Sequence, residues 1–209
     1  MKKACFLFSL FLLLCGSGAQ AAELHLEYGL SLALPSGWQV LSKKVDNQLD
    51  EFVSDSAQET GPLAPLEIIN LLSAHSGALS GGVVVVSAEP QNLANIYRNM
   101  LQTLQETAPG QEAPALRVER ELLSSGFKKV FYFVEAYPFF ISELGGRKAL
   151  VQSYIYKMAK GDPDTLVEQF CLVFDKYLIR IVFTRNTAQK KLLPAIEFIK
   201  KSVSFSLPK

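Results

Sequence analysis

Apolar and polar positions alternate most clearly between Thr165 and Thr184, in the stretch TLVEQFCLVFDKYLIRIVFT. Alternation of this kind is typical of strands that bury one face, so the stretch predicts two strands joined at Asp175-Lys176. One face of this hairpin is expected to pair Phe174 with Tyr177, Leu172 with Ile179, and Phe170 with Ile181. The other face is expected to pair Val173 with Leu178, Cys171 with Arg180, and Gln169 with Val182. Because Asp-Lys is a weaker turn sequence than Asn-Gly, a slip by one residue, which would turn one strand over, stays an alternative.

Upstream of the hairpin, the pattern predicts a mostly extended chain. The expected elements are strands at 24–28 and 30–34, a turn at Pro35-Ser36-Gly37, a short helix at 46–58, a loop at 57–65, and strands at 66–74 and 83–88. Within the second strand, Leu30, Leu32 and Leu34 share one face. The valine run at 83–86 does not alternate, which predicts a central strand covered on both faces.

The second half of the chain is expected to hold two amphipathic helices and a run of strands. The first helix begins near Pro90 and ends before Pro109-Gly110, because apolar residues recur at three-to-four spacing: Leu93, Ile96, Tyr97, Met100 and Leu104. The second begins with Thr187 as N-cap, is expected to kink or restart at Pro194, and carries one apolar face: Leu192, Ile196, Ile199 and Val203. Strands are expected between the helices at 116–124, 127–137 and 148–158, and the short turns that separate them, such as Gly145-Gly146, favour antiparallel neighbours.

The N-terminal residues have the three-part pattern of a secretory signal peptide. Two lysines precede an apolar run at residues 4–15, and Ala19-Gln20-Ala21 offers an A-x-A cleavage site. We expect cleavage after this site, a periplasmic or secreted protein, and one mature domain at 22–209 without a transmembrane segment. An uncleaved anchor and a lipoprotein modified at Cys15 are the alternatives.

Charge and cysteine content narrow the function classes. The chain holds 21 Lys and Arg against 20 Asp and Glu, and removal of the two N-terminal lysines leaves 19 against 20. A balance this close to neutral lacks the basic excess of a general nucleic-acid binder, so no nucleic-acid partner is expected. Cys171 is the one cysteine expected in the mature chain, which excludes an internal disulfide.

The order of elements resembles the PsbP-type α/β/α sandwich. A strand pair ending in Pro35-Ser36-Gly37-Trp38, a middle helix, an antiparallel meander and a terminal helix from Ile196 to Phe205 carry the resemblance over most of the mature chain. That superfamily includes the extrinsic photosystem II subunit, the Mog-type Ran-binding proteins and small exported bacterial proteins. The resemblance implies an α+β fold, with a central, mostly antiparallel sheet between helices on both faces, and a binding role without catalysis. It transfers no catalytic residue to this chain.

Residues that could carry catalysis or hold a metal are few. His25, His75 and Cys171 lie far apart in sequence, whereas zinc sites gather several such ligands. Cys171 is expected in mid-strand as a small half-buried filler, while reactive cysteines lie at helix N-termini or beside a base. No nucleophile elbow, phosphate-binding loop or dinucleotide fingerprint occurs in the sequence. We therefore expect no catalytic residue, no metal and no cofactor.

Two surface features are candidates for contact with a partner. Their residues are Tyr137, Phe139, Phe140, Lys190, Lys191, Lys200 and Lys201. The lysines lie on the expected terminal helix, where they either bind an anionic partner or form an ordinary solvated face. The aromatic residues end an expected strand in the stretch YPFFI, where they either close the core or form an exposed contact patch.

Two hypotheses of function follow. The favoured one is an exported, non-enzymatic module that binds an unidentified protein partner. The alternative is a small-ligand carrier or an enzyme that uses a cleft between sheet and helix, with Cys171 and Arg180 as its polar groups. A deep pocket lined by both residues would favour the alternative, and a filled core with an exposed apolar patch would favour the binding module.

Overall fold

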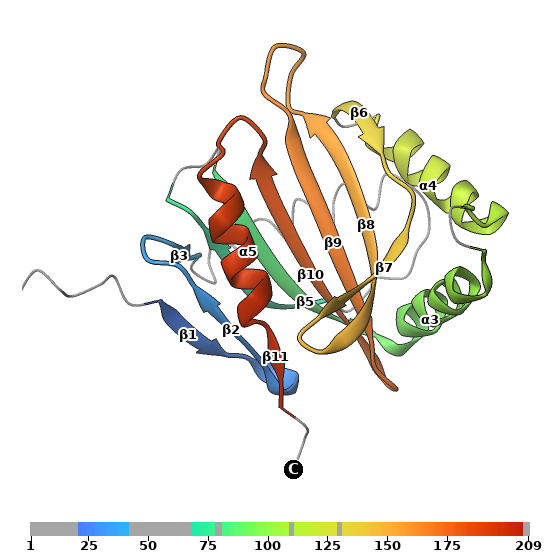
Figure 1. Ribbon diagram of the computed structural model, residues 1–209, viewed down its shortest axis with the longest axis horizontal. Helices are drawn as coiled ribbons and strands as arrows, with labels where there is room; N and C mark the ends of the chain where they lie inside the picture. Colours follow the sequence, from blue (N-terminus) through green and yellow to red (C-terminus); the bar gives the residue numbers. More distant parts are fainter. Residues whose placement is uncertain (1–20, 42–67, 78–80, 109–110, 129–130, 207–209) are drawn as a thin grey trace, which may run out of the picture.

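The computed structural model describes residues 21–41, 68–77, 81–108, 111–128 and 131–206 (Figure 1). The helix expected at 46–58 and the loop expected at 57–65 lie outside the described residues, as does almost all of the expected signal peptide. None of the described helices is long and apolar enough to span a membrane.

A large sheet forms the centre of the described structure. Its strands are β3 (Gln39–Val40), β4 (Ile69–His75), β5 (Gly82–Pro90), β6 (Tyr132–Ala136), β7 (Phe140–Leu144), β8 (Arg147–Lys157), β9 (Thr165–Val173) and β10 (Tyr177–Asn186). They lie in the order β3-β4-β5-β10-β9-β8-β6, with β7 also paired to β8. All of these pairs are antiparallel, which confirms the expected sheet type. The valine-rich strand β5 lies inside the sheet, between β4 and β10.

The β9–β10 hairpin has the predicted register. The observed pairs include Phe170 with Ile181, Cys171 with Arg180, Leu172 with Ile179, and Val173 with Leu178. The Phe174 amide donates a hydrogen bond to the Tyr177 carbonyl across the turn at Asp175-Lys176, at 2.9 Å. Alternation fixes this register because a slip would move the apolar residues of one strand out of the core.

Helix α5 (Leu192–Ser202) and a small sheet cover one face of the large sheet (Figure 1). The small sheet consists of β1 (Ala22–His25), β2 (Leu30–Leu34) and β11 (Ser204–Phe205). The residues expected to share one face of β2 and α5 are all buried: Leu30, Leu32, Leu34, Leu192, Ile196, Ile199 and Val203. Both elements share one core with side chains of β9 and β10, among them Phe170, Leu172, Ile179 and Ile181.

Helices α3 (Gln91–Glu106) and α4 (Pro114–Phe127) lie on the other side of the large sheet. They close a second core that contains Ala94, Ala113, Leu116, Phe139, Leu150, Cys171 and Leu178. Helix α3 confirms the helix expected after Pro90 and ends before Pro109-Gly110 as predicted. The fold is α+β, with a central antiparallel sheet between helices on both faces.

Helix α4 occupies the stretch for which the sequence analysis expects a strand at 116–124, and that prediction is wrong. A strand would bury Leu116 and Val118 together, but Val118 is exposed. Leu116 and Leu123 instead face the second core, at helical spacing. Pro114, in the first turn of the helix, is the local signal that favours a helix start.

Several strand boundaries also differ from the prediction. β1 ends at His25 instead of residue 28, because Tyr28 has a left-handed φ of 60° within a short 3-10 turn. The strand expected at 127–137 is shorter, since residues up to Phe127 belong to α4 and β6 spans only Tyr132–Ala136.

The terminal helix begins later than predicted. Thr187 is not its N-cap, because the backbone amide and the hydroxyl of Thr187 both donate to the Asp164 carbonyl, at 2.9 and 3.0 Å. The helix begins at Leu192, so Pro194 lies in its first turn and not in its interior. A proline there removes no intrahelical hydrogen bond, so of the two expected outcomes the kink is wrong, and the helix instead starts two residues before Pro194.

Candidate functional site

β7 and β8 form a hairpin at the expected Gly145-Gly146 turn, although β7 is not among the predicted strands. Both glycines have left-handed φ angles, 58° and 74°, as a two-residue hairpin turn of type I′ requires. A Cβ atom on Gly145 would lie 2.9 Å from ring atoms of Phe205. Glycine at this position thus allows the tip of the hairpin to pack against β11.

A bulge separates β7 from β6 along the outer edge of β8. Residues 137–139 stand opposite only residues 152–153, which leaves one residue in excess. Phe139 is turned into the second core and is 5% exposed, whereas Phe140 is 45% exposed and Tyr137 is half-buried. The two candidate phenylalanines thus have opposite roles, since one closes the core and the other lies on the surface.

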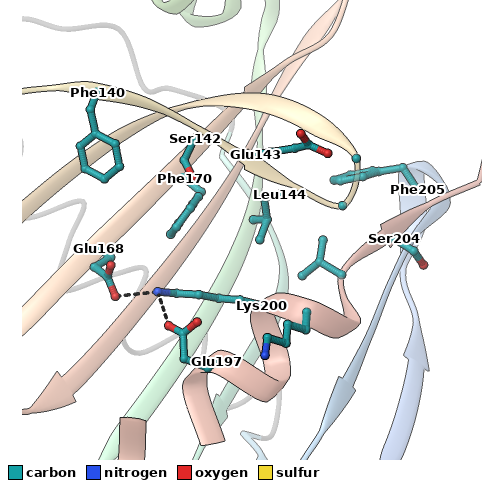
Figure 2. A pocket seen from close by; sticks show the side chains of 14 residues that line it. Phe140, Ser142, Glu143, Leu144, Glu168, Phe170, Glu197, Lys200, Ser204 and Phe205 are labelled. Atoms are coloured by element: carbon teal, nitrogen blue, oxygen red, sulfur yellow. Dashed lines mark hydrogen bonds and ion pairs between the residues drawn. The ribbon is translucent and has the colours of Figure 1, made fainter. Parts of the chain in front are cut away.

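An open groove of about 600 Å³ lies between β7, β9 and α5, and Figure 2 shows it from close by. We call it the β7 groove. Its apolar lining includes Phe140, Leu144, Phe170, Val203 and Phe205, and its charged lining consists of Glu143, Glu168, Glu197, Lys200 and Lys201. The groove therefore joins an apolar wall to a nearly balanced set of charges.

Lys200 is held within the wall of the β7 groove by two carboxylates. Its Nζ donates to Glu168 Oε2 at 2.8 Å and to Glu197 Oε1 at 3.0 Å (Figure 2). The same Nζ lies 5.3 Å from the ring centroid of Phe170 and 5.5 Å from that of Phe183. The Lys200 side chain is 13% exposed. Its charge is already matched, so Lys200 serves to close the groove wall and is poorly placed to capture an anion.

A second hollow, of about 730 Å³, lies on the other side of β7. We call it the α3-end hollow, because its lining combines the end of α3 and the chain that follows with the bulge and β7. The lining includes Leu104, Thr107, Gln111, Pro138, Phe139 and Ile141. Phe140 lines both the α3-end hollow and the β7 groove, so the two spaces meet at this exposed ring.

The four candidate lysines do not form one patch. Lys190 and Lys191 precede the first residue of α5, and Lys200 and Lys201 lie in its last turn. At 1.5 Å per residue, Lys191 and Lys200 are separated by roughly 14 Å along the helix axis. Only the pair at the C-terminal end of α5 lines the β7 groove.

Arg180 belongs to a buried polar cluster on the α3 side of the sheet. Its Nε and Nη2 donate to the Glu89 carboxylate at 2.5 and 2.8 Å, and its Nη1 donates to Gln169 Oε1 at 2.6 Å. Nη2 also lies 3.2 Å from the Tyr97 hydroxyl. Burial alone lowers the pKa of Arg180, but the hydrogen bonds to Glu89, with Cys171 and Tyr97 nearby, outweigh it and hold that pKa well above its usual value. Arg180 is therefore a permanently charged group with a dedicated counter-ion.

Cys171 lies against this cluster but does not open to solvent. It is 2% exposed within the second core. Burial raises the pKa of the Cys171 thiol to about 11, although the guanidinium of Arg180 opposes the shift. A hollow of about 380 Å³ beside α3 is lined by Arg180, Glu89 and Tyr97, and Cys171 is not part of its lining. The structure thus keeps the thiol protonated at neutral pH and away from this hollow.

The two histidines have local roles. His25 Nδ1 is hydrogen-bonded to the Ser31 hydroxyl at 2.8 Å, and His75 Nδ1 accepts from the Gly77 amide at 3.1 Å. Within the described parts of the chain, no group of three or more His, Cys, Asp or Glu residues is placed to hold a metal ion.

Phe140, Lys200 and Lys201 are candidates on the sequence alone, but the groove that joins them is visible only in the structure. The signal for the β7–β8 hairpin was available, because Gly145-Gly146 stands between two alternating stretches, FISEL and RKALV. The ion-pair partner of Lys200 could not be predicted from the local sequence. Glu168 is 32 positions away, and only the packing of α5 on β9 brings the two side chains together.

Comparisons with known proteins show only distant likeness. No protein-family model matches the chain, and no curated protein matches it. Among solved structures, the chain is similar to LpqN of Mycobacterium tuberculosis, a protein involved in cell envelope biogenesis, with 13% identity, a TM-score of 0.44, and coverage of 90% of this chain and 91% of LpqN. It is also similar to a protein from Bacteroides thetaiotaomicron, with 7% identity, a TM-score of 0.41 and coverage of 86% of this chain, which spans 46% of that protein. Likenesses at such low TM-scores carry no argument about function.

Proposed function

We propose that this protein is an exported, non-enzymatic module that binds a partner protein at the β7 groove. The observation that carries the proposal is the position of Phe140, a large aromatic side chain that is 45% exposed where two hollows meet. Exposed aromatic side chains beside apolar hollows are typical anchors of protein interfaces. The charges of Lys200, Glu168 and Glu197 are largely satisfied within the protein, so we expect apolar contact to supply most of the affinity.

Export and a single mature domain are part of this proposal. β1 begins at Ala22, the residue after the expected cleavage point, so cleavage would remove no strand or helix that the structure describes. β1 pairs with β2, which pairs in turn with β11 near the other end of the chain. This pairing supports a mature domain at 22–209 in which both ends of the sequence contribute to one layer.

We further propose that the chain is a member of the PsbP-type superfamily. The layers support this assignment, because an antiparallel sheet lies between α5 on one face and α3 with α4 on the other. The expected order of a strand pair, a middle helix, a meander and a terminal helix is present, with α4 added after the middle helix.

The carrier or enzyme alternative has less support. It requires Cys171 and Arg180 as the free polar groups of a shared cleft. Arg180 is instead paired with Glu89, and Cys171 is buried away from the adjacent hollow.

The proposal is tested by affinity capture with the tagged mature chain, cross-linked in the native envelope of its source. The test variant is Phe140→Asp, and the control is Ile96→Asp, because Ile96 is an exposed residue on α3 at 53% that lines neither hollow. We expect the wild type and the control to recover the same partner and Phe140→Asp to lose it, with equal urea midpoints for both variants. Recovery of the same partner by Phe140→Asp would overturn the proposed site.

A further inference from the structure

We infer, on the basis of the proposed function, that the partner binds as an added strand: an extended segment of its chain pairs with the outward backbone groups of Ile141 and Glu143 on β7. Among the described strands, β7 pairs only with β8, so its other side is a free sheet edge. Free edges offer unpaired N–H and C=O groups, which are the recognition elements in strand addition.

The hairpin register identifies which backbone groups are free. In a two-residue hairpin, the residues that flank the turn exchange both of their hydrogen bonds, so Leu144 and Arg147 form such a pair. Hydrogen-bonded and non-hydrogen-bonded pairs alternate along an antiparallel ladder, which makes Ser142 and Phe140 the next inward-bonding residues of β7. The N–H and C=O groups of Ile141 and Glu143 consequently point away from β8.

The two hollows supply places for the side chains of such a strand. The β7 groove lies on the α5 side of the sheet, and the α3-end hollow lies on the side of α3. Side chains of a strand point alternately to the two faces of the sheet. A segment beside β7 would therefore place its successive side chains in the groove and in the hollow, with Phe140 between them. Hollows on both faces of the edge suit a single extended chain, whose side chains alternate, better than a folded surface.

The ends of β7 limit the length of the added strand. Pro138 in the bulge lacks an N–H group, and the Gly145-Gly146 turn packs on Phe205 at the other end. Only the five residues of β7 are available between these two stops. Prolines, bulges and short edges are also the features that keep free edges from aggregating, so the β7 edge favours a matched segment over indiscriminate pairing.

The chemistry of the segment follows from the lining. Lys200 is held by Glu168 and Glu197, which leaves one negative charge in excess, and Glu112 of the α3-end hollow is paired with Arg120. The remaining charges, Glu143 and Lys201, have opposite signs. We therefore expect a largely apolar segment without a strong net charge, and binding that changes little with salt concentration.

The experiment uses displayed random peptides of about nine residues, long enough to form one strand. Peptides enriched on the full mature protein are then synthesised and serve as the probes in fluorescence binding measurements. The matched variants are Glu143→Pro, which removes an outward N–H group, and Glu143→Ala, which removes the same side chain but keeps the N–H. Proline is compatible with an edge strand when its nitrogen faces outward, and far-UV circular dichroism checks that the fold is kept.

We expect enriched peptides with apolar residues whose affinity falls at least about tenfold in Glu143→Pro and little in Glu143→Ala. A measurement on the wild type gives a second test that does not depend on the folding of a variant. Two peptides are compared, one N-methylated at its odd-numbered residues and the other at its even-numbered residues. One of them should lose binding and the other should keep it, because only every second amide of the peptide faces β7.

Strand addition would be overturned if peptides bound equally to Glu143→Pro and Glu143→Ala, or if the two N-methylated peptides bound equally. It would also be overturned if no peptide were enriched. Sedimentation that shows the protein alone as a dimer that Glu143→Pro disrupts would overturn it too, since the edge would then belong to a second copy. Strand addition can fail while capture still depends on Phe140. That result would leave the proposed binding function in place and reject only its mode.

Discussion

The buried ion pair between Glu89 and Arg180 should be structural, and substitution of one partner should show it. Glu89→Gln keeps the shape of the side chain but leaves the Arg180 guanidinium without its counter-ion. The Glu89 side chain is 3% exposed and that of Arg180 is 20% exposed, so solvent compensates little for the lost charge. Removal of one partner of a buried pair costs about 3–5 kcal/mol, and we expect about 3 kcal/mol here because Arg180 keeps its bond to Gln169 and some contact with water.

Urea denaturation at pH 7, followed by circular dichroism, measures this change as a shift of the midpoint at constant m value. The control is the double variant Glu89→Leu with Arg180→Met, which replaces both charges by apolar side chains of similar size. It should lie within about 1 kcal/mol of the wild type, because the desolvation cost of the two ions disappears together with their attraction. The single variants Glu89→Leu and Arg180→Met complete the double-mutant cycle, and its coupling energy should then reach about 2 kcal/mol or more. Additive effects of the single substitutions would refute the structural assignment of the pair and return Arg180 to the list of candidate ligand contacts.

Three further predictions concern the core, the thiol and the N-terminus. Phe170→Ala should lower the free energy of unfolding by about 3–5 kcal/mol, since the ring is buried beneath Lys200. Glu168→Ala should lower it by less than about 1 kcal/mol, because Lys200 keeps its ion pair with Glu197, and similar denaturation midpoints for the two variants would contradict the packing. The Cys171 thiol should react slowly with thiol reagents at neutral pH, and rapid labelling of the folded protein would speak against burial. Because the pKa of the thiol is raised from 9.0 to about 11, the stability gained by burying the protonated thiol should be full below pH 9 and lost as pH rises through 11. Intact-mass analysis of protein from the envelope should show a chain that begins at Ala22, and a retained N-terminus or a lipid adduct would disprove the expected cleavage.

The sequence predicts the β9–β10 hairpin to the residue because its apolar pattern favours the observed register over the one-residue slip that the weak Asp175-Lys176 turn leaves open. A shift by one position would turn one strand over and move either Phe170 or Ile181 out of the first core, in which both are buried. Local pattern and global packing therefore favour the same pairing, and alternation alone is enough to find it.

The same reasoning fails for α4 because its apolar residues fit two periods. Leu116, Val118 and Leu122 alternate like a strand, whereas Leu116 and Leu123 recur like a helix. Tertiary contact with the second core decides between them, and it buries the helical set. Only Pro114 gives a local sign of the outcome.

The candidate site is only partly readable from the sequence. Phe140 is visible as an aromatic residue in an unusual stretch, but its exposure depends on a bulge that shows only once β6 and β7 are paired with β8. The groove is formed by residues from β7, β9 and α5, which lie far apart in the chain. No local sequence pattern predicts contacts between these elements, since the contacts arise from packing of the layers.

A photo-crosslinking side chain at position 140 tests the central claim most directly. The same side chain at position 96 on α3 is the control, since both positions are solvent-exposed but only Phe140 lines the two hollows. Irradiation in the native envelope, followed by mass spectrometry, should give one dominant protein adduct at position 140 and none at position 96, with the cross-linked partner peptide mapped to one extended segment. Absence of an adduct at position 140, or the same adducts at both positions, would contradict a binding function at the β7 groove.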